Sequence, residues 1–186
     1  MRIHIAAATL ALAITVPAQS QTAGSFALSS KEVAAGKPFP LEQVFGGMGC
    51  TGKNISPSLA WRGAPAAARS FAVTVYDPDA PTGSGWWHWV VYNIPGNVSG
   101  LIAGAGDPAK KLLAPGAMQG NTDFGTPGYG GPCPPAGDKP HHYIFTVYAL
   151  KVDKLDVPAG ATAAYVGFNI HANTIGKATF TALYGR

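Results

Sequence analysis

Two aspartates lie in a turn that two prolines make rigid. Asp77 and Asp79 alternate with Pro78 and precede Pro81, directly after a run of β-branched and aromatic residues. A proline fixes φ and removes a backbone donor, so the turn is expected to hold both carboxylates in place. A carboxylate held in this way can orient a histidine, whereas the alternative interpretation is a turn that only ends a strand.

A histidine among tryptophans is the second group that can do chemistry. His88 is flanked by Trp87 and Trp89. Burying an imidazole is unfavourable unless the ring has a hydrogen-bond partner, so His88 is either a satisfied core residue or part of a site. Alternation along a strand predicts that His88 shares one face with Val90 and Tyr92, while the two tryptophans point to the other face.

A glycine- and proline-rich loop leads into the third group, His141-His142-Tyr143. Because side chains alternate along a strand, His141 and Tyr143 are expected to project into one pocket, with His142 on the opposite face. The alternative interpretation is a pair of surface histidines.

Taken together, Asp77, His88, His141 and Tyr143 suit a small anion, above all a phosphate monoester. A protonated histidine and a tyrosine hydroxyl donate hydrogen bonds to phosphate oxygens, and a carboxylate can hold a histidine in its charged form. Trp86 can pack on an organic or quaternary ammonium head group. The sequence therefore predicts an anion pocket at the ends of strands.

Strand-like and helical segments must position these groups. Four segments have the pattern of β-strands, with two weaker candidates: 71–76, 87–94, 143–150 and 178–184, then 25–29 and 58–61. Apolar residues recur at three- and four-residue spacing over 161–174, which predicts a helix that Gly176 ends.

The composition indicates a single, mainly β domain. Hydrophobic residues make up 47% and charged residues only 12%, which excludes general disorder. The 24 glycines and 16 prolines disfavour a helical bundle. Of these, 11 glycines and 7 prolines lie in 96–140, which is expected to be an ordered loop. Its packing is expected to come from Leu112, Leu113, Met118, Phe124 and Tyr129.

Residues 1–20 have the pattern of a secretory signal peptide. A short basic start precedes the apolar run 5–16, and small residues precede the expected cleavage site near Ser20. The run is shorter than the ~20 residues of a transmembrane helix, so no transmembrane segment is predicted. The mature domain, 21–186, is expected to be periplasmic or secreted. Its mild positive charge without a basic run gives no indication of nucleic-acid binding.

Export makes pairing of the two cysteines possible. Cys50 and Cys133 are the cysteines of the chain, and a bridge between them would close a loop of more than eighty residues. The alternative is two separate buried thiols, because the sequence does not supply the Cα separation that a disulfide needs.

The sequence resembles the phosphatidylethanolamine-binding protein family, also called the Raf-kinase-inhibitor-like family, and within it the bacterial YbhB/YbcL-type branch. The likeness extends over about 25–184 and rests on three motifs with an additional early segment: 77–81, 87–95 and 131–143, with 52–61. The resemblance implies a PEBP-like β-sandwich, with a large central sheet, a smaller sheet and short C-terminal helices.

The resemblance also implies a ligand site and a structural role for the turn. The pocket residues of the family correspond to Asp77, His88, His141 and Tyr143 in this chain, with Trp86 at the rim. The backbone amide of Gly131 is expected to approach the ligand closely, because glycine has no side chain. Asp79, between Pro78 and Pro81, matches a turn-holding aspartate, and the Ala80–Pro81 bond matches one that the family tends to hold cis. This chain has Cys133 where mammalian members have glycine, and it lacks their C-terminal extension, so a more open pocket is expected.

Three functions are compatible with these residues. The first is a binding protein without catalytic residues, cofactor or metal, which takes a small phosphate-like anion or a phospholipid head group and acts on a protein partner such as a kinase or peptidase. If charged histidines hold the anion, affinity falls as the pH rises through about 6–7. The second is a metal- or His/Asp-dependent hydrolase, although no metal-ligand spacing or activated nucleophile is visible. The third is a purely structural sandwich.

Overall fold

The computed structural model describes residues 24–186. The predicted signal peptide, 1–20, lies outside the described residues, as do the first residues of the predicted domain, 21–186. None of the helices within 24–186 combines the length and apolar character that crossing a membrane requires.

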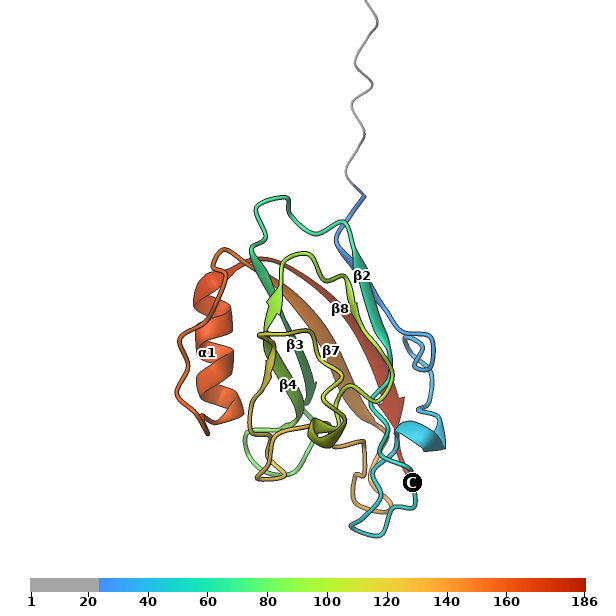
Figure 1. Ribbon diagram of the computed structural model, residues 1–186. Helices are drawn as coiled ribbons and strands as arrows, with labels where there is room; N and C mark the ends of the chain where they lie inside the picture. The colour runs from blue at the N-terminus through green and yellow to red at the C-terminus, as the bar shows by residue number, and fades with distance from the viewer. Residues whose placement is uncertain (1–23) are drawn as a thin grey trace, which may run out of the picture.

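Two antiparallel sheets and one helix form three layers (Figure 1). The strands of the large sheet are, in spatial order, β6 (Met118–Gln119), β4 (Trp86–Pro95), β3 (Ser70–Asp77), β7 (His141–Leu150) and β8 (Thr174–Tyr184). Those of the small sheet are β1 (Ala27–Ser29), β2 (Leu59–Arg62) and β5 (Gly100–Leu101). The helices are α1 (Ala163–Asn173) and two 3-10 turns, η1 (Leu41–Gln43) and η2 (Pro108–Lys110). The predicted mainly β sandwich, with a large and a smaller sheet, is confirmed.

The large sheet is buried on both faces because each face packs on a different layer. On β3, Phe71, Val73 and Val75 belong to the core that also contains Trp61 of the small sheet. Ala72, between them in the sequence, belongs to a second core beneath α1. Alternation along β3 thus places successive side chains in two different cores. This double burial explains the nearly continuous apolar runs of the central strands.

Helix α1 covers the outer face of the large sheet. Its first turn is capped by the Thr162 hydroxyl, which accepts a hydrogen bond from the Tyr165 amide at 3.2 Å. Val166 and Ile170 are buried against that sheet, as the spacing predicted. The predicted end was wrong, because the helix stops at Asn173 and the chain enters β8 at once. Gly176 lies within β8, where a Cβ would come within 2.8 Å of a Pro65 ring carbon, so close packing explains the glycine.

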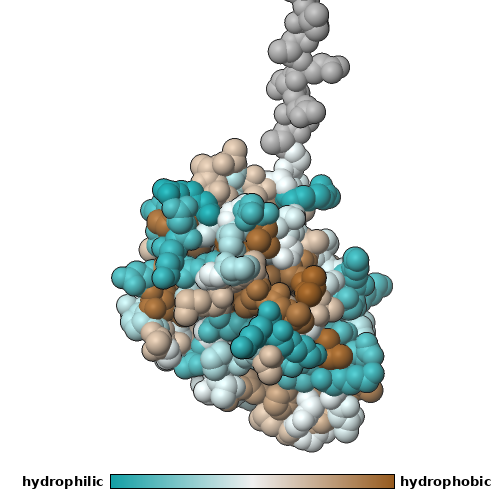
Figure 2. Space-filling view, in the orientation of Figure 1, coloured by the Kyte–Doolittle hydropathy of each residue, from teal (hydrophilic) through white to brown (hydrophobic). Residues whose placement is uncertain are grey.

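The segment 96–140 is ordered, as predicted, but only part of it is packed. It contains β5, η2 and β6. Tyr129 is buried, whereas Leu112 and Met118 are each 41% exposed, so the prediction that they pack the loop was wrong. On the face seen in Figure 2, hydrophilic side chains surround small hydrophobic patches.

Candidate functional site

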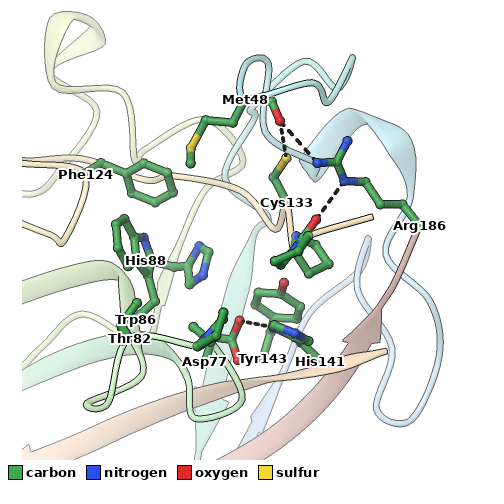
Figure 3. A pocket seen from close by; sticks show the side chains of 14 residues that line it. Met48, Asp77, Thr82, Trp86, His88, Phe124, Cys133, His141, Tyr143 and Arg186 are labelled. Carbon is green, nitrogen blue, oxygen red and sulfur yellow. Dashed lines mark hydrogen bonds and ion pairs between the residues drawn. The ribbon is translucent and has the colours of Figure 1, made fainter. Parts of the chain in front are cut away.

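A cavity of about 250 Å³ lies at the ends of β3, β4 and β7. The four residues predicted for the pocket, together with Trp86, line it and point toward one another in Figure 3: Asp77, His88, His141 and Tyr143. Segments far apart in the sequence therefore bring a carboxylate, two imidazoles and a phenol to one place.

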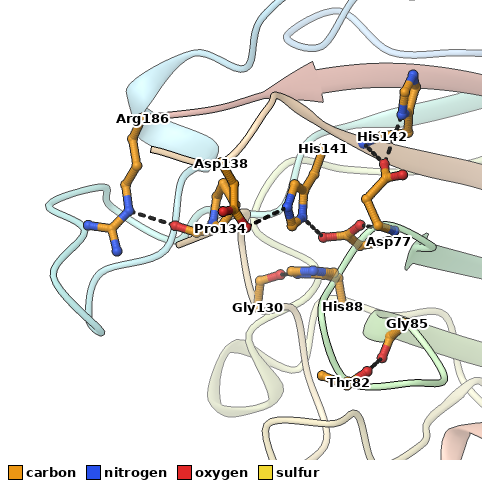
Figure 4. A network of polar contacts seen from close by, with 11 residues as sticks. Asp77, Thr82, Gly85, His88, Gly130, Pro134, Asp138, His141, His142 and Arg186 are labelled. Carbon is orange, nitrogen blue, oxygen red and sulfur yellow. Dashed lines mark hydrogen bonds and ion pairs between the residues drawn. The ribbon is translucent and has the colours of Figure 1, made fainter. Parts of the chain in front are cut away.

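A buried contact between a histidine and a carboxylate joins β3 to β7. His141 Nδ1 lies 2.8 Å from Asp77 Oδ2, and both side chains are at most 5% exposed. The other ring nitrogen, Nε2, lies 3.5 Å from Oδ2 of Asp138, so the imidazole sits between two carboxylates (Figure 4). His141 and Tyr143 are buried and His142 is exposed, as alternation predicted.

The proline turn is held by its own carboxylates. Asp77 Oδ1 accepts a hydrogen bond from the Asp79 amide at 2.8 Å, and Asp79 Oδ2 accepts one from the His142 amide at 2.7 Å. Partial burial opposes ionisation of Asp79, but hydrogen bonds from His142 outweigh this effect and lower its pKa. Pro81 lines the cavity, whereas Pro78 is exposed and outside the lining.

The peptide bonds of residues 24–186 include no cis bond, so the cis Ala80–Pro81 bond implied by the family resemblance is not found. The tertiary amide before a proline has only a small preference between its two isomers. The sequence alone therefore does not decide which isomer the fold selects.

His88 is buried, which favours its neutral form. Its Nδ1 lies 2.7 Å from the Gly130 carbonyl oxygen, to which the ring must donate because a carbonyl only accepts. Burial lowers the pKa of His88 to about 4, although the Gly130 carbonyl and Asp77 act in the opposite direction. In the neutral ring Nε2 is then an acceptor. The lowered pKa favours the neutral ring and argues against the charged histidine donor considered in the sequence analysis at this position.

A β-bulge determines which way His88 points. Val75 pairs with Trp89 and Tyr76 pairs with Trp87, so His88 is an extra residue in β4. Trp89 belongs to the core between the sheets, and the His88 ring lies 5.0 Å from the Tyr143 ring of the same core. The prediction that His88 shares a face with Val90 and Tyr92 was therefore wrong, since those two pack beneath α1.

The Tyr143 hydroxyl makes no hydrogen bond of proper geometry with any of the residues 24–186. The side chain is 1% exposed, and its oxygen is one of two buried polar side-chain atoms without a partner in 24–186. Burial raises its pKa, and Asp77 adds to this effect through its negative charge and through a hydroxyl–carboxylate contact that falls short of hydrogen-bond geometry. The hydroxyl is therefore a protonated donor beside the cavity, and it can donate a hydrogen bond to an acceptor that enters the cavity.

Two loops that form the cavity wall are joined by the predicted disulfide. Cys50 and Cys133 are bonded with their Cα atoms 6.0 Å apart, and Cys133 lines the cavity. Gly131 was predicted to offer its amide to the ligand, but that amide donates to Asn54 Oδ1 at 2.7 Å. A Cβ at Gly131 would lie 2.2 Å from the Gln43 carbonyl oxygen, so the glycine is required for loop packing.

Sequence reasoning missed two important residues of the wall. Arg186 donates from Nε to the Pro134 carbonyl at 2.7 Å, and from its two Nη atoms to the carbonyls of Gly49 and Met48. Phe124 packs edge-on against the rings of Trp86 and His88. Phe124 was predicted only as loop packing, and nothing in the local pattern marks Arg186.

No metal site accompanies the cavity in the described chain. Within 24–186, no three His, Cys, Asp or Glu side chains are grouped so that they could hold a metal ion. Asp77 and His141 instead use their facing atoms to bond each other.

The sequence and the fold match known proteins. The family model described as phosphatidylethanolamine-binding protein matches residues 29–185. YbcL of Escherichia coli K12 is 52% identical over 165 residues, which are 89% of this chain and 90% of YbcL. YbhB of the same organism is 49% identical over 84% of this chain and 98% of YbhB. The crystal structure of YbcL, described as a new member of the mammalian PEBP family, matches with a TM-score of 0.85 at 51% identity, covering 88% of this chain and 99% of that chain.

Proposed function

The chain belongs to the phosphatidylethanolamine-binding protein family, and on this basis we propose that its cavity binds a phosphate group without catalysing a reaction. The ligand is a small phosphate monoester or a phospholipid head group. One observation carries the proposal: the Tyr143 hydroxyl is a buried donor without a partner, and it lies beside the cavity. An unsatisfied buried donor costs about 1–3 kcal/mol, which a ligand oxygen would recover.

The charges around the cavity support an anion. Arg186 lines the wall, and its guanidinium bonds backbone carbonyls and forms no ion pair with a carboxylate among residues 24–186. The carboxylate of Asp77 is occupied by His141 and by the Asp79 amide. The guanidinium charge of Arg186 is thus available to attract a phosphate. The negative charge of Asp77 is offset by the hydrogen bonds that its carboxylate accepts.

His88 supports a particular protonation state of the ligand. Because Nδ1 donates to Gly130, Nε2 of the neutral ring accepts. The monoanion of a phosphate monoester carries one P–O–H group and can donate it to this nitrogen, whereas a monoester dianion, or the phosphodiester of an intact phospholipid, cannot. Tyr143 as donor and His88 as acceptor therefore fit the two kinds of oxygen that a monoanionic phosphate presents.

The remainder of the wall supports an organic substituent on the phosphate. Trp86, Phe124 and Met48 line the cavity and give it a mainly apolar side. The Trp86 indole is half-buried, so its ring can pack against an alkyl or ammonium group of a head group. This arrangement favours an ester over inorganic phosphate alone.

Three observations support binding over catalysis. Thr82 donates its hydroxyl to the Gly85 carbonyl. Cys133 is bonded to Cys50, and burial raises the pKa of the Tyr143 hydroxyl. A nucleophile needs a free or activated oxygen or sulfur atom, and these cavity groups are engaged or protonated.

The Asp77–His141 pair favours a second candidate, a hydrolase in which His141 acts as a base. Phosphatase and peptidase assays, together with metal analysis of protein purified without a tag, test it. Turnover that disappears in His141→Ala would support the hydrolase.

We further propose that the protein is exported and that a protein partner responds to the bound phosphate. The disulfide supports an oxidising compartment, where such bonds persist. N-terminal sequencing of the protein recovered from cells tests cleavage near Ser20. Pull-down experiments with and without phosphoethanolamine test the partner.

A calorimetric panel tests the binding function. Inorganic phosphate, phosphoethanolamine and phosphotyrosine are titrated into the wild type, His141→Ala and His142→Ala. We expect binding to the wild type and to His142→Ala, because His142 faces solvent, and weaker binding to His141→Ala. Absence of binding heat with all three compounds, supported by equilibrium dialysis, would contradict the proposed function.

A further inference from the structure

A second cavity lies on the other side of Phe124. It has a volume of about 530 Å³ and shares Phe124 with the first cavity. Its lining includes the polar residues Lys53, Asn54, Asp107, Thr122 and Thr126. A cavity with these groups suits a hydroxyl-rich ligand better than a hydrocarbon chain.

The Phe124 ring separates the two cavities. It stacks on Phe45, which lines the second cavity, with ring centroids 4.8 Å apart. It packs edge-on against Trp86 at 5.4 Å and His88 at 5.5 Å, which both line the first cavity. Figure 3 shows the ring above His88 and Trp86.

Beneath the ring, a hydrogen bond between a side chain and the backbone joins the linings of the two cavities. His88 lines the first cavity and Gly130 lines the second, and His88 Nδ1 donates to the Gly130 carbonyl at 2.7 Å. Gly130 has no side chain, and a Cβ there would lie 2.1 Å from Cε2 of Phe124. The aromatic ring therefore occupies the space that a side chain at 130 would otherwise fill.

From this arrangement we propose that Phe124 determines the largest ligand that the phosphate site accepts, an inference that rests on the proposed function. With the ring in place, the ligand is limited to the first cavity, whose 250 Å³ lies below the range of about 300–1,000 Å³ that is typical for larger organic ligands. Without the ring, the polar second cavity becomes continuous with the phosphate site. A sugar phosphate would then place its phosphate beside Tyr143 and its hydroxyl groups in the second cavity.

Titrations of wild type and Phe124→Ala with inorganic phosphate and glucose 6-phosphate test this inference. We expect Phe124→Ala to raise the ratio of glucose 6-phosphate affinity to inorganic phosphate affinity at least about tenfold over the wild type, because Tyr143 and His88 can bind the phosphate group of both compounds. Phe124→Leu, which retains part of the side chain, should give an intermediate gain and serves as a second variant if Phe124→Ala folds poorly.

Phe45→Ala is the matched control, since it loses the same ring contact but leaves Phe124 between the cavities. Unchanged glucose 6-phosphate binding in this variant is expected. An equal gain in Phe45→Ala would overturn the inference, as would a Phe124→Ala protein that binds phosphate but shows no gain for the sugar phosphate. Failure of both phosphate compounds to bind any of the proteins would instead overturn the proposed function, and the inference with it.

Discussion

Asp77 and His141 lie 64 residues apart in the sequence and are joined by a 2.8 Å bond in the interior of the protein. The two oxygens of Asp77 have different partners, because Oδ2 accepts from His141 and Oδ1 accepts from the Asp79 amide. One carboxylate therefore fixes both the orientation of the imidazole and the start of the proline turn. The cavity geometry depends on this double role.

Asp77→Asn should destabilise the protein more than Asp79→Asn. An amide has one acceptor oxygen, so Asp77→Asn must either place its NH2 group against a donor or force His141 to carry its proton on Nε2. Asp79 accepts both His142 bonds through a single oxygen, which asparagine retains. We expect Asp77→Asn to lower the free energy of unfolding by about 1–3 kcal/mol, and Asp79→Asn to lower it by less than about 1 kcal/mol. Urea unfolding at pH 7 measures both, and equal losses would contradict the assigned roles.

His88 should make the protein less stable in acid. The pKa of His88 in the folded protein is about 4, below the ordinary value of 6.5. The neutral ring therefore contributes fully to the free energy of unfolding above pH 6.5, and this contribution is lost as the pH falls toward 4. The difference between these two pKa values corresponds to about 3 kcal/mol in the free energy of unfolding. His88→Asn can still donate to Gly130 but does not titrate. Between pH 7 and 4, the free energy of unfolding of the wild type should fall by about 3 kcal/mol more than that of the variant. Parallel pH profiles would show that His88 is not the titrating group.

The pH dependence of binding should follow the ligand and not His88. A phosphate monoester loses its last proton near pH 6 and then has no P–O–H group to donate to His88. Phosphoethanolamine should therefore bind more weakly as the pH rises from 5 to 8. Ethanolamine O-sulfate carries one negative charge without a titrating proton, so its affinity should be weaker and independent of pH in this range. A parallel fall for both esters would instead indicate a titrating group of the protein.

Reduction of the disulfide should weaken both stability and binding. The bond links residues 83 apart, and disulfides contribute about 2–4 kcal/mol, chiefly by restricting the unfolded chain. Cys133 and the nearby Met48 line the cavity, so loosening the two loops also disturbs its wall. Denaturant unfolding and phosphate titration with and without dithiothreitol measure the two effects. The double variant Cys50→Ser/Cys133→Ser, insensitive to reductant, is the control, and a wild type unaffected by the reductant would contradict this prediction.

Strand alternation predicted one half of the site and failed on the other for a physical reason. His141 and Tyr143 lie where β7 pairs with β8 in unbroken register, so their common face could be predicted from spacing. His88 lies in a bulge of β4, where one extra residue reverses the faces that follow. A bulge arises from the packing of neighbouring strands and leaves no periodic signal in the sequence.

The remaining wall residues illustrate a second limit of sequence analysis. Phe124 lies in a turn and Arg186 follows β8, so neither belongs to a periodic pattern that would place it. Gly131 could be recognised as important but not assigned a role, since close packing and ligand approach both require glycine. Only the contacts of Gly131 with Gln43 and Asn54 show that close packing, and not approach to a ligand, explains this glycine.

The central claim is that the Tyr143 hydroxyl donates to a phosphate oxygen, and Tyr143→Phe tests it most directly. Tyr129→Phe is the matched control, because the buried Tyr129 hydroxyl already donates to the Gln43 carbonyl at 2.9 Å. We expect Tyr129→Phe to lose about 1 kcal/mol of stability and to bind phosphoethanolamine normally. Tyr143→Phe should be at least as stable as the wild type, yet its calorimetric affinity should fall at least about tenfold, since a hydrogen bond to a charged group contributes about 1.5–3 kcal/mol. Wild-type affinity in Tyr143→Phe would contradict the account.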